Sequence, residues 1–330
     1  MSIPLVLASD DRFAVGAGVM IQSVLENTCS PVRFLYLHAD LSNENIARIK
    51  QIVAGRPDCR LEMVDASQAL ARLPAPVRSS IYSRLTYARL LAPSLLQEED
   101  RAIYLDCDVL VRDDIRQLFE IDLEGHAFSA MPDYGVARWV KRSPKDKQYF
   151  DDLTGGRPAE QYFNAGVLVM DLAEWRRQRI TEQTEAVIRS SGHLRYADQC
   201  ALNVVAEGRF RRLPERWNLF SIHGSAAKDP LLSPQKRQAL REAYANPSLV
   251  HYICEKPWTP FPMPYKRDFT TVLRRSPWKD YRESITDLPP ERRAVLWKSW
   301  RRTAVRLRLT SSEVEFSLLG NQLIHWNRAA

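Results

Sequence analysis

Two aspartates two residues apart interrupt an apolar stretch of the chain. Asp106 and Asp108 lie within residues 102–111, which are otherwise rich in aliphatic, aromatic and β-branched side chains. On a strand, residues two apart point to the same side, so the two carboxylates would lie next to each other. Like charges in an apolar setting repel each other and lose hydration unless a cation lies between them. The pattern is typical of a divalent metal site with phosphate oxygens beside the ion, and a solvated polar turn is the alternative.

Other polar residues also occur where apolar runs end. Asp65 directly follows an expected strand, and Asp10 lies two residues after the end of another. In a parallel sheet, ligands bind at the carboxyl ends of the strands, so these aspartates are expected to converge with Asp106 and Asp108. Each one alone is equally typical of a turn residue. His251, taken alone, is more typical of a core or edge histidine than of a metal ligand.

The elements that would position these side chains alternate along the first 65 residues. Apolar runs at 4–8, 32–38 and 60–64 alternate with helical stretches at 16–27 and 42–54. This order indicates an α/β protein whose parallel strands are joined by right-handed crossovers. The chain contains no glycine-rich phosphate-binding fingerprint. Metal and side chains would therefore have to hold any bound phosphate.

Further along the chain, apolar and amphipathic stretches continue to alternate. A helix is expected at 81–96, which carries Arg89 and leads into the aspartate-bearing stretch. Residues 134–160 are polar and basic, with at most one helix at about 145–153, so we expect a lid or an acceptor-binding loop there. The remaining expected elements are strands at 102–111, 127–132, 162–171 and 249–258 and helices at 172–190 and 198–206.

Composition places the chain among ordinary globular proteins. Its 330 residues, 45% hydrophobic and 26% charged, suffice for one large α/β domain with a C-terminal appendage. No run of eighteen apolar residues is present, and no signal peptide is expected. The five cysteines are scattered without metal-type spacing and are typical of reduced thiols. We therefore expect a cytoplasmic location.

The C-terminal part differs in character, and we expect domains at 1–264 and 265–330. Residues 289–309 carry seven basic side chains and one acid, interleaved with Trp297, Trp300 and aliphatic residues. The second part is therefore expected to be a basic, tryptophan-rich helical extension. Such a helix fits the anionic inner face of a cytoplasmic membrane, to which the chain would bind peripherally, or it is a solvated helix packed on the main domain. Nucleic acid is not an expected partner, because no nucleic-acid-binding fold accompanies the basic stretch.

Four separate blocks of the chain resemble glycosyltransferase family 8, which includes bacterial lipooligosaccharide galactosyl- and glucosyltransferases and glycogenin. The resemblance runs from residue 3 to about 258 and implies the GT-A fold, a Rossmann-like mixed β-sheet flanked by helices. It also implies a nucleotide-sugar donor, Mn²⁺ and retention of the anomeric configuration. The joint match in order is far more specific than any single motif. The matching blocks are 104–111, 163–167, 198–199 and 251–258.

The resemblance also implies roles for individual residues. Asp106 and Asp108 would bind the metal with His251 as the third protein ligand, and the imidazole favours Mn²⁺ over the alternative, Mg²⁺. Lys256 would contact the donor diphosphate. It follows His251 one residue sooner than is usual in the family, and the usual intervening glycine is absent. The remaining donor contacts would be Ala8 and Asp10 at the uracil, Phe13 in place of a stacking tyrosine, Arg89, and Asp133, Asn164, Ala165, Asp198 and Gln199 around the sugar hydroxyls.

The catalytic candidates are Gln199, Asp198 and Lys256, and two mechanisms are open. A double displacement needs a nucleophile on the sugar face opposite UDP. The amide of Gln199, which the resemblance places nearest the anomeric carbon, is a poor nucleophile. The favoured route is front-face departure and return, in which a UDP phosphate oxygen deprotonates the acceptor.

We therefore predict a retaining hexosyltransferase that uses UDP-galactose or UDP-glucose and Mn²⁺. Its acceptor would be a glycan or glycolipid, such as lipopolysaccharide, another lipid-linked glycan or another cell-surface glycan. One alternative is a non-catalytic nucleotide-sugar binding protein with the same pocket. A sugar nucleotidyltransferase is the other, although the glycine-rich, basic N-terminal loop expected of that class is absent at 7–11.

Overall fold

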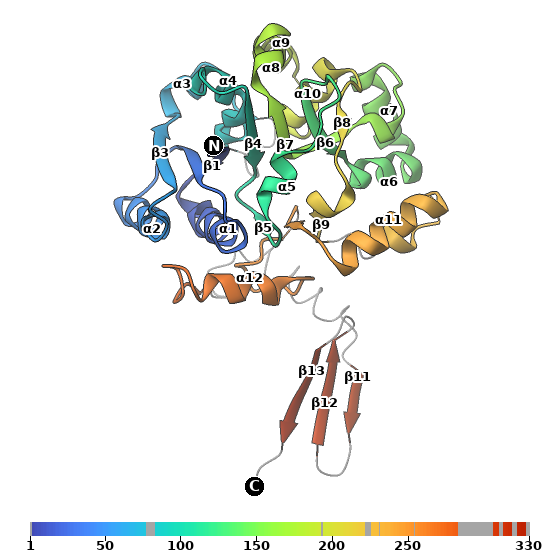
Figure 1. Ribbon diagram of the computed structural model, residues 1–330. Coiled ribbons are helices and arrows are strands. Elements are labelled where there is room, and N and C mark those ends of the chain that lie inside the picture. Colours follow the sequence, from blue (N-terminus) through green and yellow to red (C-terminus); the bar gives the residue numbers. More distant parts are fainter. Residues whose placement is uncertain are drawn as a thin grey trace.

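The protein was analysed as a computed structural model. A seven-stranded mixed sheet with the order β3-β2-β1-β4-β7-β6-β8 forms its centre, with helices on both faces (Figure 1). This architecture confirms the predicted α/β class. The structure describes residues 2–76, 83–192, 194–221, 226–230, 232–253, 255–282, 306–309, 313–318 and 322–327.

The first half of the sheet is parallel, as the alternating pattern predicted. Strand β1 (Ile3–Ser9) pairs with β2 (Val32–His38), which pairs with β3 (Arg60–Asp65). Helices α1 (Ala14–Asn27) and α2 (Asn43–Ala54) make the two crossovers. The carboxyl ends of the three strands therefore lie at one edge of the sheet.

The second half of the sheet is largely antiparallel. Strand β4 (Arg101–Leu105) is parallel to β1 but antiparallel to β7 (Phe163–Asp171). Strand β6 (Phe128–Pro132) is antiparallel to β7 and parallel to the short edge strand β8 (Arg211–Arg212). The start of β7 consequently lies beside the end of β4, where the two aspartates follow.

At residues 106–108 the chain leaves the central sheet, which corrects the prediction of one continuous strand at 102–111. The next strand, β5 (Val109–Val111), belongs to a second sheet in the order β5-β10-β9. Strand β10 (Leu249–His251) is shorter than the expected 249–258 and pairs antiparallel with β5 and parallel with β9 (Leu219–Phe220). The two aspartates therefore lie in a turn between two sheets and not within a strand.

The long segment after β6 is mostly helical, which corrects the prediction of a loop with at most one helix. Helices α6 (Tyr134–Arg142) and α7 (Pro144–Thr154) occupy it. Asp133 caps α6 by accepting a hydrogen bond from the Val136 N–H at 3.0 Å, and Ser143 caps α7 in the same way. Each cap satisfies a backbone donor that would otherwise lack a partner.

The remaining helical regions broadly follow the expected order. The expected helix at 172–190 is split into α8 (Leu172–Arg177) and α9 (Ile180–Ser190), because Arg179 adopts a left-handed conformation with φ 54°. The aspartate-bearing turn is preceded by the 3₁₀ helix η2 (Arg84–Leu91) and α4 (Ala92–Leu95). The other elements are η1 (Asp11–Phe13), α3 (Ser67–Ala71), α5 (Ile115–Phe119), η3 (Ala159–Gln161), α10 (Ala197–Ala206), η4 (Glu215–Trp217), η5 (Ala226–Lys228), α11 (Pro234–Ala245) and α12 (Lys266–Leu273).

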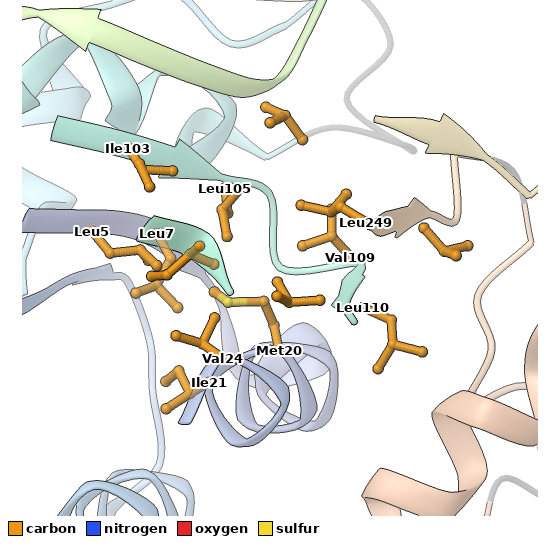
Figure 2. Packing of buried hydrophobic residues seen from close by; sticks show 14 of the residues in the cluster. Leu5, Leu7, Met20, Ile21, Val24, Ile103, Leu105, Val109, Leu110 and Leu249 are labelled. Atoms are coloured by element: carbon orange, nitrogen blue, oxygen red, sulfur yellow. The ribbon is translucent and has the colours of Figure 1, made fainter. Parts of the chain in front are cut away.

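The core consists of two apolar clusters, one on each face of the central sheet. Alternate residues of β1 point to opposite faces: Leu5 and Leu7 belong to one cluster, Val6 and Ala8 to the other. Burial of each large aliphatic side chain contributes about 1.5–3 kcal/mol. The first cluster packs α1 against the strands that hold the aspartate turn, through Leu5, Leu7, Met20, Ile21, Val24, Ile103, Leu105, Val109, Leu110 and Leu249 (Figure 2).

The chain beyond residue 264 contains both helix and strand. Helix α12 directly follows this predicted boundary, and its Phe269 is fully buried in the same cluster as α1. Strands β11 (Arg306–Leu309), β12 (Glu313–Leu318) and β13 (Gln322–Asn327) form an antiparallel sheet, which corrects the expectation of a helical extension there. Most of the basic stretch 289–309 lies outside the described residues. Within the described parts, no helix has the length and apolar character needed to span a membrane.

Candidate functional site

Three side chains predicted to bind a metal come together between the two sheets. Asp106 and Asp108 lie in the β4–β5 turn, and the β10–β5 pairing places His251 opposite Val109. His251 Nε2 lies 3.2 Å from Asp108 Oδ1 and 3.8 Å from Asp106 Oδ2. One ligand atom from each residue falls within a 4.8 Å cluster. Two carboxylates and one imidazole are a donor set suited to a divalent cation.

Gly166 in β7 leaves the space that this cluster needs. A Cβ atom at this position would overlap the His251 imidazole and lie 2.5 Å from Asp106 Oδ2. The backbone carbonyl of Gly166 accepts a hydrogen bond from the Asp106 N–H at 2.8 Å, which fixes the turn against β7. The residues present therefore fit a bound metal in both donor chemistry and available space.

Asn218 orients the histidine and was missed by the sequence prediction. Its Nδ2 donates to Asn164 Oδ1 at 3.0 Å, which leaves its Oδ1, 2.9 Å from His251 Nδ1, as an acceptor. Asn218 therefore accepts from the His251 Nδ1–H, which would leave Nε2 available to give its lone pair to a bound metal. Asn218 is fully buried. No apolar periodicity in the sequence marks this residue. Its role becomes visible only because the strand that it precedes, β9, pairs with β10, which carries His251.

Lys256 reaches the cluster although it follows His251 one residue sooner than is usual in the family. Its Nζ lies 2.5 Å from Asp108 Oδ2 and donates to the Tyr252 carbonyl at 2.9 Å. Burial opposes ionisation of Asp108, but the nearby Lys256 and His251 outweigh it and lower the pKa of the carboxyl. Burial likewise opposes the charge on Lys256, and Asp108 outweighs it and raises the lysine pKa. Both groups are therefore charged at neutral pH.

Arg89 links the metal cluster to the second set of predicted residues. Its guanidinium lies 2.7 Å from Asp198 Oδ2 and 3.1 Å from Asp106 Oδ1, and it also donates to the Ala165 carbonyl. The Tyr104 ring lies 4.3 Å from the guanidinium carbon, and the Tyr104 hydroxyl donates to Asp106 Oδ1 at 2.9 Å. Arg89 is therefore a buried connection between Asp106 and Asp198.

Asp198 is almost completely enclosed, with 1% of its surface exposed. The Thr86 hydroxyl donates to its Oδ1 at 2.6 Å, and Arg89 faces its Oδ2. Burial raises the pKa of Asp198 to about 6, with Arg89 and Thr86 acting in the opposite direction. Oδ1 thus has a hydrogen-bond donor, and Oδ2 has the ion pair with Arg89 without a hydrogen bond. This enclosure suits a positioning role better than attack on a substrate carbon.

Gln199 lies at the centre of the remaining predicted sugar-side residues. Its Nε2 donates to Asp133 Oδ2 at 3.1 Å, and its Oε1 accepts from Asn164 Nδ2 at 3.1 Å and from the Ala165 N–H at 3.2 Å. Burial raises the pKa of Asp133, partly offset by hydrogen bonds from Val136, Gln199 and Asn164. The Gln199 amide therefore brings together the first residues of β7, α6 and α10.

The residues predicted to contact uracil lie at the carboxyl end of β1. Asp10 accepts a hydrogen bond from the Phe13 N–H at 3.2 Å, and Phe13 packs edge to face against Trp258 with ring centroids 5.7 Å apart. Ala8 lies two residues before Asp10, near the end of β1, where it pairs with Leu37 of β2. Asp65 does not join the cluster as expected, because its carboxylate accepts from the Ser67 N–H in an exposed turn.

The mixed sheet with its aspartate turn between two sheets defines a GT-A fold. The chain belongs to glycosyl transferase family 8, whose profile matches residues 4–260. It is 28% identical over 276 residues to a lipopolysaccharide 1,2-glucosyltransferase of Escherichia coli K12, covering 82% of this chain and 77% of that protein. It is also 29% identical over 285 residues to general stress protein A of Bacillus subtilis 168, covering 83% and 94% of the two chains.

Solved structures with the same fold agree with this assignment. The galactosyltransferase LgtC, in complex with donor and acceptor sugar analogues, matches with a TM-score of 0.70 and 26% identity over 88% of this chain and 99% of that one. The bifunctional glycosyltransferase WbbM matches with a TM-score of 0.76 over 84% of this chain and 50% of that one. At 23% identity, the second match supports the fold alone.

Proposed function

We propose that the chain is a metal-dependent, retaining hexosyltransferase that moves galactose or glucose from the corresponding UDP-sugar to a glycan acceptor. The observation that carries this proposal is the cluster of Asp106, Asp108 and His251, with Lys256 beside it and Gly166 leaving space for an ion. Relatives described as a lipopolysaccharide glucosyltransferase and a galactosyltransferase support a hexose donor and a lipopolysaccharide or other cell-surface glycan acceptor.

Asp106, Asp108 and His251 would hold the metal, and the imidazole favours Mn²⁺ over Mg²⁺. When bound, the ion supplies positive charge that neutralises the donor diphosphate as UDP departs. Lys256 adds a fixed positive charge on the same side of the site. Because its ammonium is held by Asp108 and the Tyr252 carbonyl, it needs little reorganisation to face an anionic leaving group.

The sugar would lie against Gln199, Asp133 and Asn164, whose amide and carboxylate groups match hexose hydroxyls. Asp198, which the family resemblance also places at the sugar, is more deeply buried than these residues and is held in an ion pair with Arg89. The Gln199 amide is a weak nucleophile and already holds Asp133 and Asn164. These constraints favour a front-face mechanism, in which a UDP oxygen takes the acceptor proton, over a double displacement.

The proposal is tested by hydrolysis of UDP-galactose and UDP-glucose by the full chain, before and after removal of divalent metal with EDTA. Slow UDP release that returns with Mn²⁺ is expected, and Asp108→Ala should abolish it. Asp65→Ala is the matched control, because this aspartate also follows a strand but lies outside the cluster. Unchanged hydrolysis in Asp108→Ala contradicts metal binding there. Pyrophosphate as the product would indicate a nucleotidyltransferase, and binding without hydrolysis would indicate a non-catalytic protein.

We further propose that the catalytic domain, residues 1–264, is brought to the cytoplasmic face of a membrane by the basic stretch 289–309. The support is its sequence, in which seven basic residues alternate with tryptophan and aliphatic side chains. Co-sedimentation of the full chain with vesicles containing phosphatidylglycerol should fall when Arg292, Arg293, Arg301 and Arg302 are replaced by glutamine. Equal co-sedimentation of the two proteins would contradict this role.

A further inference from the structure

A partly exposed tryptophan lies next to the sugar side of the site. Trp139 in α6 is 43% exposed, the higher value of the two exposed large hydrophobic side chains among the described residues. The other, Leu95, lies at the end of α4. Neither residue belongs to the positions that the family resemblance assigns to the donor.

The tryptophan ring is directed along α6 toward Asp133. Long side chains on a helix point back toward its N-terminus. The Trp139 ring accordingly lies 4.0 Å from the position that a Cβ atom of Gly135 would occupy. Trp139 is six residues after Asp133, so their Cα atoms are separated by about 9 Å along the axis of α6. Because the tryptophan ring points toward the N-terminus of the helix, the ring lies closer to Asp133 than its own Cα atom does. The ring therefore borders the place proposed for the donor sugar.

Tyr196, the residue directly before α10, holds the ring in place. Trp139 stacks on Tyr196 with ring centroids 6.2 Å apart and planes inclined by 17°. Tyr196 in turn stacks on Phe150 at 6.4 Å and 11°. The Tyr196 carbonyl accepts a hydrogen bond from the Gln199 N–H at 2.9 Å. The aromatic stack is thus fixed to the two elements that carry Asp133 and Gln199, which makes it a rigid surface.

The cations around this surface are already paired. Arg138 and Arg142 both bind the buried carboxylate of Asp229, at 2.6 and 2.9 Å. Lys141 binds Glu160 at 3.0 Å. An anionic group would have to compete with these carboxylates, whereas the apolar C–H face of a neutral pyranose needs only a flat aromatic partner. The charge pattern favours an uncharged sugar over a phosphorylated one.

We propose that Trp139 is a specificity-determining residue that stacks on the acceptor hexose, one sugar unit beyond the donor. This inference rests on the proposed hexosyl transfer, because it takes the donor sugar to lie against Gln199 and Asp133. Tyr196 and Phe150 support the tryptophan ring from behind. The surface selects acceptors that present a continuous C–H face, which a β-galactoside offers more fully than a mannoside.

The test compares Trp139→Ala and Trp139→Phe with the wild-type full chain, and Leu95→Ala serves as the matched exposed-residue control. Transfer is measured with methyl β-D-galactopyranoside, methyl β-D-glucopyranoside and methyl α-D-mannopyranoside as acceptors. Trp139→Ala should raise the acceptor KM about tenfold, with the donor KM changed less than twofold, and Trp139→Phe should recover most of the loss. Leu95→Ala should behave like the wild type.

Binding of the same glycosides is also measured by ligand-observed NMR, which requires no turnover. If hydrolysis of the donor fails but glycoside binding still depends on Trp139, the proposed function is wrong and the stacking role stands. An unchanged acceptor KM and unchanged binding in Trp139→Ala overturn the inference. The acceptor would then lie elsewhere, for example in the cavity of about 390 Å³ lined by Tyr87, Leu194 and Ala197. Equal loss in Trp139→Ala and Leu95→Ala would also overturn it.

Discussion

Replacement of Gly166 by alanine should impair metal binding, and a metal-free measurement separates this loss from the effect on the fold. The added Cβ would lie 2.5 Å from Asp106 Oδ2, whereas an ordinary contact between carbon and oxygen is about 3.3 Å or longer. The carboxylate or the strand must therefore move by about 0.8 Å, which exceeds the tolerance of about 0.2 Å in metal–ligand distances. Since Gly166 does not adopt a left-handed conformation, alanine brings no backbone strain. We expect the Kd for Mn²⁺ to rise at least tenfold, which corresponds to about 1.4 kcal/mol.

Isothermal titration of the purified full chain with Mn²⁺ measures this change, and thermal unfolding in EDTA measures the effect on the fold. Gly192→Ala is the matched control, because no atom lies within 4 Å of a Cβ at that position. The metal-free Tm of Gly166→Ala should fall by only a few degrees, because the new Cβ also overlaps the His251 ring and overpacking costs about 1–3 kcal/mol. A Mn²⁺ affinity within twofold of the wild type would refute the interpretation of Gly166 as the residue that makes room for the ion.

Two further substitutions test how the site is supported. Asn218→Ala should weaken Mn²⁺ binding by about 10- to 100-fold while the three ligands stay in place, because His251 Nδ1 loses the acceptor that orients it; a titration with unchanged affinity would show that another group orients the ring. Gly18→Ala should lower the free energy of unfolding by about 1–3 kcal/mol, because the new methyl group would overlap the Trp278 ring against α1. Urea unfolding followed by circular dichroism measures this loss, and a variant as stable as the wild type would show that Trp278 can move away without cost.

The parallel half of the sheet could be predicted because its strands are short apolar runs separated by well-marked helix starts. The turn between the two sheets could not. Residues 102–111 remain apolar on both sides of the aspartates, and only the pairing of β5 with β10 shows that the chain changes sheets there. Such a pairing joins segments far apart in the sequence and leaves no local pattern. The two carboxylates were nevertheless predicted to lie together, since a tight turn and a strand both bring residues i and i+2 close.

Helix α6 was missed for a different reason, whereas α7 corresponds to the one helix expected at about 145–153. The caps of both helices, Asp133 and Ser143, are visible in the sequence, but the polar and basic composition of residues 134–160 favoured a loop, although α6 is amphipathic. Conversely, the three strands after residue 305 alternate polar and apolar residues, as in Val314, Phe316 and Leu318, and this period of two was hidden by the preceding basic stretch. The three metal ligands were predicted from sequence blocks that resemble the family, whereas Asn218 lies in none of these blocks.

The position of the aspartate turn between two sheets has a thermodynamic consequence. A cation held by Asp106, Asp108 and His251 would act as a cross-link between the end of β4 and the end of β10, segments separated by more than half of the catalytic domain's sequence. The three ligands come together only when the small sheet β5-β10-β9 is docked on the central sheet. The free energy of metal binding therefore also stabilises the docked arrangement of the two sheets. Amide protons of β5 and β10 would then exchange more slowly when metal is bound, and those of β2 and β3, outside the cross-link, would change little.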